Sequence, residues 1–404
     1  MTRTEERLAD ALAAAVSGLR EDTLRPLAAP ARRDRRWARW LAPAAAAAAV
    51  TLVVSLAAVL TGHSPALPGP AAGTSGVPRY YADMDFHGKA VVRATATGAV
   101  TDAVPVPRLA DAPDGNITAA ANGVFFVAAF ASQSQERIYR FEVTSTGKVS
   151  GFAPVPGGTI PGGGTAMAAS PDGSELAISA KPSQVSAAEI VVINTATGRR
   201  TVWQGGLARR GFRGFDISSL SWTSDQQELA FTVQWCKPFE VNSQTCEQAD
   251  KGGRRAAEVR ALNPAARGGR LDSGRLLLRQ SARYPYIASA AISPDGTTIT
   301  ALVLHGPVRV PSPGTVPDHL SVVQISAATG RELSVLYRRR LGDTGEINGS
   351  PDPLALSTNA TGRNLMLIVG VCNLHCTNGL NGWIHGGRLI PLQPVDGSLA
   401  SETW

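Results

Sequence analysis

Four cysteines carry the most versatile side-chain chemistry in this chain of 404 residues. They form two close pairs, Cys236 with Cys246 and Cys372 with Cys376, and His375 lies next to the last of them. Pairs at such short spacing favour two local disulfides in an oxidising compartment. A zinc site made of all four thiolates, with the imidazole of His375 nearby, is the alternative, but it requires the two pairs to meet. We expect disulfides and no metal.

Apart from the cysteines, the sequence shows one Asp-x-Asp pair and none of the common enzyme motifs. Asp83 and Asp85 form an Asp-x-Asp pair that could hold a cation, but alternating carboxylates at a strand end are expected to be solvated. The sequence has no Gly-x-Ser-x-Gly elbow, His-Glu-x-x-His pair or Walker A loop, and no Gly-x-Gly-x-x-Gly that opens a helix. We therefore predict no catalytic residue and no cofactor.

A repeated hairpin organises the part of the chain that must position these residues. The segments 167–179 and 291–303 each place Ser-Pro-Asp-Gly between two apolar runs, and degenerate copies begin at Ile117, Leu220 and Leu356. Ser, Pro and Gly at the first, second and fourth positions suit a type I turn followed by a bulge. The sequence thus predicts five hairpins of one type.

A second hairpin type, usually ending in Thr-Gly, alternates with the first. Two hairpins per unit make four strands, and four-stranded units in near-regular repetition indicate a β-propeller. We predict an all-β fold with six blades, or alternatively seven. The first unit lacks its leading hairpin, so a strand after Val395 is expected to complete it and close the ring. The second turns are centred on Gly98, Gly147, Gly198, about Gly268, Gly330 and Gly387.

An uncharged stretch precedes the repeats, with no Asp, Glu, Lys or Arg between Arg39 and Arg79. Residues 40–61 are almost entirely apolar, and a helix of that length, rising about 1.5 Å per residue, spans the roughly 30 Å hydrocarbon core. Arginines crowd the residues before it, with Trp37 and Trp40 at the boundary, as is typical of the cytoplasmic side. We predict an uncleaved transmembrane helix; a cleaved signal peptide is the alternative.

This orientation sets the remaining domain boundaries and the localisation. Residues 1–39 are expected to form an Arg-rich cytoplasmic segment with a short amphipathic helix, which could dock a cytoplasmic partner. Residues 62–78 are a linker rich in Pro and Gly. Residues 79–404 form the propeller, on the outer side of the cell membrane.

The alternation of Ser-Pro-Asp-Gly and Thr-Gly hairpins resembles the WD40-like propeller repeats of TolB-type proteins. The layout of a short Arg-rich N-terminus, one span and an exterior propeller is similar to membrane-anchored propeller proteins of high-GC, actinobacterial-type bacteria. The Trp-Asp dipeptides of WD40 repeats proper are absent. The resemblance covers nearly the whole chain and implies a fold rather than a reaction.

Long loops mark the candidate binding surface. In such blades the loops between the second and third strands share one face with the connections between blades. These loops are longest at 236–255, 305–319 and 372–381, and both cysteine pairs fall in them. Long loops on a rigid scaffold are where binding sites concentrate. The expected rim residues are Trp235, Lys237, Phe239, Arg309, His319, Asn373 and His375.

Composition narrows the class of partner. The net charge of +7 comes from a chain with 34 Arg and only 5 Lys. It therefore reflects a general preference for Arg, which is weak evidence for nucleic-acid binding, and no nucleic-acid partner is expected. We expect a non-catalytic binding, sensing or scaffold module for a protein, peptide or envelope glycan. The alternative is a propeller hydrolase or lyase acting on an envelope polymer, because propeller enzymes gather acids from several blades without a linear motif.

Overall fold

The residues that the computed structural model describes lie within Leu67–Trp404. The predicted N-terminal segment and transmembrane helix, the linker up to residue 76 and the predicted closing strand after Val395 lie outside the described residues. In the part that is described, no helix has the length and hydrophobicity needed to cross a bilayer. The described residues are 77–392 without 86, 110–114, 133, 163–165, 182–187, 208–213, 237–255, 267, 307–318, 341–349, 359–364 and 373–375.

Twenty-three strands form six antiparallel sheets within these ranges. Blade 1 holds β1 (Tyr80–Met84), β2 (Lys89–Ala94) and β3 (Val100–Pro105). Blade 2 holds β4 (Asn116–Ala119), β5 (Val124–Ser132), β6 (Gln135–Val143) and β7 (Val149–Pro161). Blade 3 holds β8 (Met167–Ala169), β9 (Glu175–Ala180), β10 (Glu189–Asn194) and β11 (Arg200–Gln204).

The second half of the ring repeats the pattern with longer strands. Blade 4 holds β12 (Gly214–Trp222), β13 (Leu229–Cys236), β14 (Ala256–Leu262) and β15 (Arg275–Arg279), with a 3-10 helix at Leu271–Ser273. Blade 5 holds β16 (Tyr286–Ile292), β17 (Thr298–His305), β18 (His319–Ser326) and β19 (Glu332–Arg340). Blade 6 holds β20 (Ser350–Thr358), β21 (Leu365–Cys372), β22 (Cys376–His385) and β23 (Arg388–Pro391).

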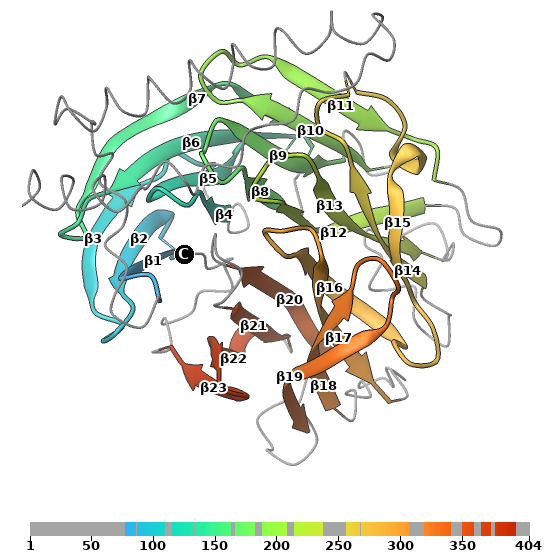
Figure 1. Ribbon diagram of the computed structural model, residues 1–404. Helices are drawn as coiled ribbons and strands as arrows, with labels where there is room; N and C mark the ends of the chain where they lie inside the picture. The colour runs from blue at the N-terminus through green and yellow to red at the C-terminus, as the bar shows by residue number, and fades with distance from the viewer. Residues whose placement is uncertain are drawn as a thin grey trace, which may run out of the picture. The chain divides into compact units, whose positions relative to one another are not determined.

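The sheets stand in a ring as the blades of a propeller (Figure 1). Each is a meander of neighbouring strands, and the innermost strands β4, β8, β12, β16 and β20 pack against one another in succession. The prediction of six blades is confirmed and the seven-bladed alternative is wrong, because the strands of the described residues form six sheets and a hydrophobic cluster joins the last sheet to the first. That cluster contains Val77, Tyr81, Met366 and Leu392.

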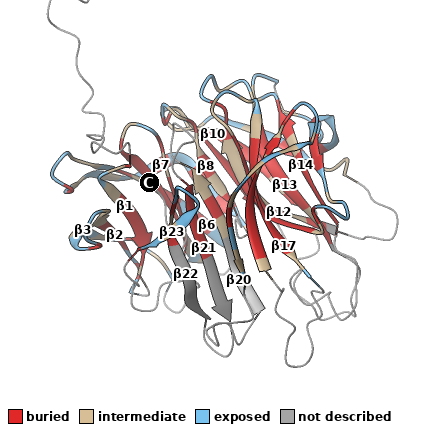
Figure 2. Ribbon diagram, turned by 60° about the horizontal axis from the view of Figure 1, so that its bottom comes forward, coloured by how far each residue is buried: buried red, intermediate tan, exposed pale blue. Residues whose placement is uncertain are grey.

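The hydrophobic core lies between the blades, so both faces of a sheet are apolar and buried (Figure 2). Serine hydroxyls of β12 form hydrogen bonds with backbone N–H groups on the inner edge of β16. Ser219 Oγ accepts a hydrogen bond from Ala290 N (3.1 Å) and donates one to Thr232 Oγ1 (2.7 Å), while Ser221 Oγ accepts one from Ile292 N (2.9 Å). Polar side chains of β12 therefore take the place of a further strand at that edge.

The Ser-Pro-Asp-Gly hairpins depend on their aspartate. Before β17, Asp295 Oδ1 accepts hydrogen bonds from the hydroxyls of Ser293 (2.6 Å) and Thr297 (2.8 Å) and from Thr297 N (3.0 Å). These bonds lower the pKa of Asp295, and the Ser293 hydroxyl contributes most. Asp172 in blade 3 accepts the same set of bonds from two serines of its turn. The carboxylate therefore locks the turn in both complete copies of the motif.

The degenerate copy in blade 4 replaces the glycine by Gln226, which has a φ of +59°. Gly173 and Gly296 occupy the same left-handed position at +71° without a steric cost. The Gln226 side chain donates a hydrogen bond to Asp172 of blade 3. Burial by itself would raise the pKa of Asp172, but this bond and those within its own turn lower it to about 2. A contact between blades thus offsets the strain at Gln226.

The second hairpins turn on glycines, as predicted. Those at the six predicted positions all have a positive φ, between +66° and +86°. The Gly198 hairpin also packs tightly on blade 2, because a Cβ on Gly198 would lie 2.8 Å from Pro156 C and 2.9 Å from Gly157 N. Arg200 fastens the same contact by donating from Nε to Gly157 O (2.8 Å). At Gly330, by contrast, a Cβ would meet nothing within 4 Å.

We expect Gly198→Ala to destabilise the propeller more than Gly330→Ala. Both substitutions place alanine in the left-handed region, at a cost of roughly 1–2 kcal/mol. Only Gly198→Ala adds a clash between blade backbones, worth about a further 1–3 kcal/mol. Urea unfolding of the two variants, followed by circular dichroism, measures the difference. Equal losses would contradict the close contact between blades 2 and 3.

Candidate functional site

The loop face is the end of the propeller where the second strand of a blade turns into the third and where one blade connects to the next. Its widest intervals separate β13 from β14, between Cys236 and Ala256, and β17 from β18, between His305 and His319. Of the predicted rim residues, Trp235 and His319 are described. Lys237, Phe239, Arg309, Asn373 and His375 lie outside the described residues, as does Cys246.

The cysteines are placed by their backbone alone. Cys236 ends β13, and Cys372 and Cys376 lie directly opposite each other on β21 and β22. Opposed residues of an antiparallel pair have Cα atoms about 4.5–5.5 Å apart, within the range that a disulfide spans. The two disulfides stay a prediction.

Trp235 differs from the expectation of an exposed rim residue, because only 4% of it is accessible. Its indole belongs to the apolar cluster between blades 3 and 4, together with Trp203, Phe215 and Leu271. The reason is strand register: Trp235 is the last residue but one of β13 and pairs with both Phe215 and Ala256. A position that close to the loop is still inside the sheet.

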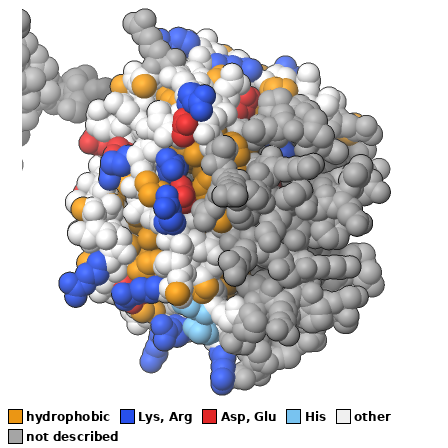
Figure 3. Space-filling model, turned by 90° about the vertical axis from the view of Figure 1, so that its right-hand side faces the viewer, with side chains coloured by type: hydrophobic (Ala, Val, Ile, Leu, Met, Phe, Trp, Pro, Cys, Tyr) orange, Lys and Arg blue, Asp and Glu red, His pale blue; other side chains and the backbone are white. Residues whose placement is uncertain are grey.

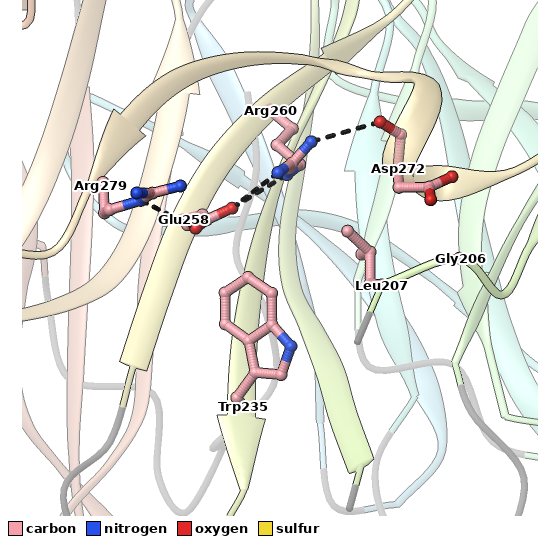
Figure 4. A pocket seen from close by; sticks show the side chains of 7 residues that line it. All are labelled: Gly206, Leu207, Trp235, Glu258, Arg260, Asp272 and Arg279. Carbon is pink, nitrogen blue, oxygen red and sulfur yellow. Dashed lines mark hydrogen bonds and ion pairs between the residues drawn. The ribbon is translucent and has the colours of Figure 1, made fainter. Parts of the chain in front are cut away.

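Trp235 nevertheless lines a pocket of about 330 Å³ at the junction of blades 3 and 4, which we call the junction pocket (Figure 4). Side chains from β13, β14 and β15 form one side, and the 3-10 helix with the segment after β11 forms the other. In Figure 4 the indole lies beneath the carboxylate and guanidinium groups, and Leu207 faces them. The lining residues are Gly206, Leu207, Trp235, Glu258, Arg260, Asp272 and Arg279.

The chain before the 3-10 helix brings the two sides together by running along β11. Gln204 N donates to Gly269 O (2.9 Å), Gly269 N donates to Val202 O (3.1 Å), and Leu271 N donates to Gly205 O (3.2 Å). This pairing presses Gly206 against the next residue of the helix, so that a Cβ on Gly206 would lie 2.6 Å from Asp272 Cγ. Blade 4 thereby covers the outer edge of blade 3 and shapes the pocket.

Glu258 holds the charged wall of the junction pocket. Its side chain is 5% exposed and accepts hydrogen bonds from Arg260 Nε (3.0 Å) and Arg279 Nε (3.0 Å). Arg260 also donates from Nη1 to Gly274 O (2.9 Å), which fixes its guanidinium against the strand connection. The two guanidinium groups compensate the loss of hydration at this buried side chain.

Two charged groups remain available to a ligand in the pocket. Arg279 is 59% exposed and uses only Nε within the described residues, so its terminal nitrogens face solvent. Asp272 forms an ion pair with Arg270, whose hydrogen bond lowers the pKa of the carboxyl. The pocket therefore presents a donor and an acceptor above an apolar floor, an arrangement suited to binding a polar group.

The Asp-x-Asp pair behaves differently from the expectation. Asp83 is fully buried on β1 and accepts a hydrogen bond from Arg93 Nε (2.9 Å), whereas Asp85 accepts one from Lys89 N (2.7 Å). Burial raises the pKa of Asp83 to about 6, against the pull of Arg93. The expectation of a solvated pair is wrong for Asp83. The described residues contain no cluster of three or more metal-ligating side chains.

Sequence reasoning missed Glu258, Arg260 and Arg279. The available signal is a Glu-x-Arg pair in a run that otherwise reads as a buried strand, since residues two apart share one face of a strand. The same spacing occurs in blade 2, where Arg140 pairs with Glu142 (2.6 Å) on the exposed surface of β6. Spacing alone therefore does not distinguish a pocket from a solvated ion pair.

We expect Glu258→Gln to lower the free energy of unfolding by about 2 kcal/mol or more, because it leaves two guanidinium groups facing a neutral amide at a buried position. Glu142→Gln removes the equivalent exposed pair from the third strand of blade 2 and should cost no more than about 1 kcal/mol. Urea denaturation of both variants compares the two costs. A loss at Glu258 as small as that at Glu142 would mean that solvent already screens the pocket network.

Comparisons with known proteins assign this chain to no family. No protein-family model matches the chain, and no curated protein matches it. Among solved structures, Kuenenia stuttgartiensis hydrazine synthase shares 15% identity over 71% of this chain and 69% of that one, with a TM-score of 0.39. The Dos1 propeller shares 12% identity over 80% and 69%, with a TM-score of 0.38.

A third likeness is to the β-propeller domain of Cps50 (Swd1) from Myceliophteria thermophila, with 8% identity over 77% of this chain and 82% of that one and a TM-score of 0.40. Likeness this distant carries no argument about ligand or activity. The repeated hairpins and the strand pairing themselves identify the architecture, a WD40-like six-bladed β-propeller.

Proposed function

We propose that this protein is a non-catalytic binding module, held at a membrane, that recognises a protein, peptide or envelope glycan. The observation that carries the proposal is the junction pocket, where the Glu258 network stands over the indole of Trp235. A rigid pocket with a few oriented polar groups and an apolar floor is the usual form of a ligand site.

The pocket's size and chemistry suit one polar unit of a larger molecule. A volume of about 330 Å³ is at the small end for ligand sites, which is enough for a single sugar ring or amino-acid side chain. Arg279 can donate to a hydroxyl or carbonyl oxygen, and Asp272 can accept from a hydroxyl or amide. Both chemistries occur in glycans and in peptides.

The state of the acids favours binding over hydrolysis. A general acid needs a carboxyl group whose pKa is near the working pH and which reaches the substrate. Glu258 is shared by two guanidinium groups, and the pKa of Asp272 is lowered. Asp83 has a suitable pKa of about 6, but it is fully buried and cannot meet a substrate. None of these three acids therefore supports the hydrolase or lyase alternative.

We expect Arg279→Ala to weaken ligand binding by about tenfold, because it removes a charge-assisted hydrogen bond worth roughly 1.5 kcal/mol or more. The matched control is Arg275→Ala, which removes an exposed, ion-paired arginine of the same strand outside the pocket lining. The measurement is calorimetric titration of the full chain with a panel of peptides and envelope-glycan fragments.

Two results would overturn this proposal. A panel member that binds the Arg279→Ala variant as tightly as the wild type would remove the junction pocket as its site. Turnover of any panel member by the wild-type chain, detected by mass spectrometry of the products, would replace binding by catalysis.

The membrane location belongs to the same proposal and rests on the sequence of residues 40–61. The uncharged stretch and the arginines before it support a cytoplasmic N-terminus and an exterior propeller. The full chain should stay in the membrane fraction after alkaline carbonate extraction, and a variant lacking residues 40–61 should be released. Extraction of both forms alike would refute the anchor.

A further inference from the structure

Five polar side chains share one face of blade 5 at the loop face, and we call them the His305 cluster. Across the strands, His305 pairs with His319, which pairs with Arg340, and Ser321 pairs with Arg338. Opposed residues, and residues two apart on one strand, lie on the same face of an antiparallel sheet. The ends of β17, β18 and β19 therefore bring two imidazoles, two guanidinium groups and a hydroxyl together.

The two imidazoles are stacked. The ring centroids of His305 and His319 are 4.4 Å apart and their planes differ by 5°. The Nε2 atom of His305 is 2.7 Å from Ser321 Oγ, and either atom can be the donor. Parallel rings point their nitrogen lone pairs in parallel directions, so this arrangement does not converge on one metal ion.

Among the described residues, most of the charged groups that act on His305 are basic. The pKa of His305 is lowered, first by burial and then by His319 and Arg338, while Glu332 at the other end of β19 acts weakly in the opposite sense. Glu332 is paired with Arg283 (3.4 Å). Among the ion pairs of the described residues, none includes Arg338. Within the described residues, Glu332 is therefore the one carboxylate that favours a protonated imidazole at His305, and it acts weakly.

Basic side chains accompany histidine on the surface. Figure 3 shows histidines (pale blue) beside Lys or Arg side chains (blue) at one edge of this side of the molecule. Arg338 is exposed, whereas His305 and His319 are half-buried. An anion that reached Arg338 would stand over imidazole N–H groups in partly dehydrated surroundings, where charge-assisted hydrogen bonds are strong.

We propose that the His305 cluster binds an oxyanion of the phosphate class and takes up a proton from solvent as it does so. The charge of the anion stabilises the protonated form, one imidazole of the stacked pair accepts the proton, and Arg338 completes the contact. By linkage, a ligand that favours the protonated pair binds more tightly as the pH falls. The site is separate from the junction pocket and does not depend on its ligand.

The experiment follows the histidine side chains of the full chain by nitrogen-15 NMR in non-ionic micelles. Inorganic sulfate serves as the first probe, because its charge is the same at about pH 5.5 and at about pH 7.5, and inorganic phosphate is the second. We expect both to shift the signals of His305 and His319. The affinity for sulfate should rise about tenfold or more as the pH falls from about 7.5 to about 5.5. Uptake of one proton changes the affinity by up to about tenfold per pH unit.

Variants test which residues carry the effect. Arg338→Gln, an exposed change, should weaken sulfate binding at least fivefold, whereas Arg331→Gln, at the opposite end of β19, should leave it unchanged. His319→Gln should abolish the pH dependence. His385→Gln, on the next blade, is the control for loss of a histidine and should preserve it.

The source of the phosphate group is a separate arm of the test. Vesicles of phosphatidylcholine, with or without phosphatidylglycerol, replace the soluble anions. Shifts that require phosphatidylglycerol identify a lipid headgroup, and shifts with free phosphate alone identify a soluble phosphate. The proposal fails if no anion moves the two histidine signals, if binding ignores pH, if Arg338→Gln binds as the wild type does, or if Zn²⁺ alone perturbs the pair.

Discussion

The structure depends on the fact that each sheet is apolar on both faces. A blade of this kind cannot be stable alone, because it would expose one or both of its faces to water, at a cost of about 25 cal/mol per Å² of apolar surface. Each blade is therefore buried between two neighbours. Every apolar face is covered only when the last blade packs against the first and the ring is closed. Closure here brings Tyr81 of blade 1 onto Met366 of blade 6, both fully buried.

Packing between blades also creates the polar features of the molecule. The hydroxyls of β12 satisfy the inner edge of β16, and the Gln226 side chain bridges two turns. The outer edge of blade 3 is paired by the segment before the 3-10 helix of blade 4, and the junction pocket lies beside that pairing. The junction pocket therefore arises from the way two adjacent edges are covered rather than from an added loop.

The charged side chains of both candidate sites are positioned by strands rather than by loops. Glu258, Arg260 and Arg279 lie within β14 and β15, and the His305 cluster lies at the ends of β17, β18 and β19. Side chains on strands are held by cross-strand neighbours, so their geometry survives variation in the connecting loops. Both candidate sites use this property, one with a shared carboxylate and the other with stacked imidazoles.

The amino-acid sequence by itself determined the blades. A turn that needs a residue in the left-handed region selects glycine, so Gly198 and Gly330 predict their hairpins. The Ser-Pro-Asp-Gly motif around Asp295 likewise predicts a turn, because its carboxylate can accept hydrogen bonds from that turn. These are local requirements, and they are readable without the fold. Gln226 shows the limit of such local prediction, because the partner of its side chain, Asp172, lies in another blade.

The tertiary structure alone decided burial and partnership. Trp235 adjoins a long loop in the sequence and was expected to be exposed, but it is buried in the core between two blades. Asp83 was expected to be solvated, but it is buried and hydrogen-bonded to Arg93. Glu142 and Glu258 have the same spacing to an arginine, yet one is solvated and the other forms a pocket wall. The physical reason is that dehydration depends on the neighbouring blade, which the order of residues within one strand does not specify.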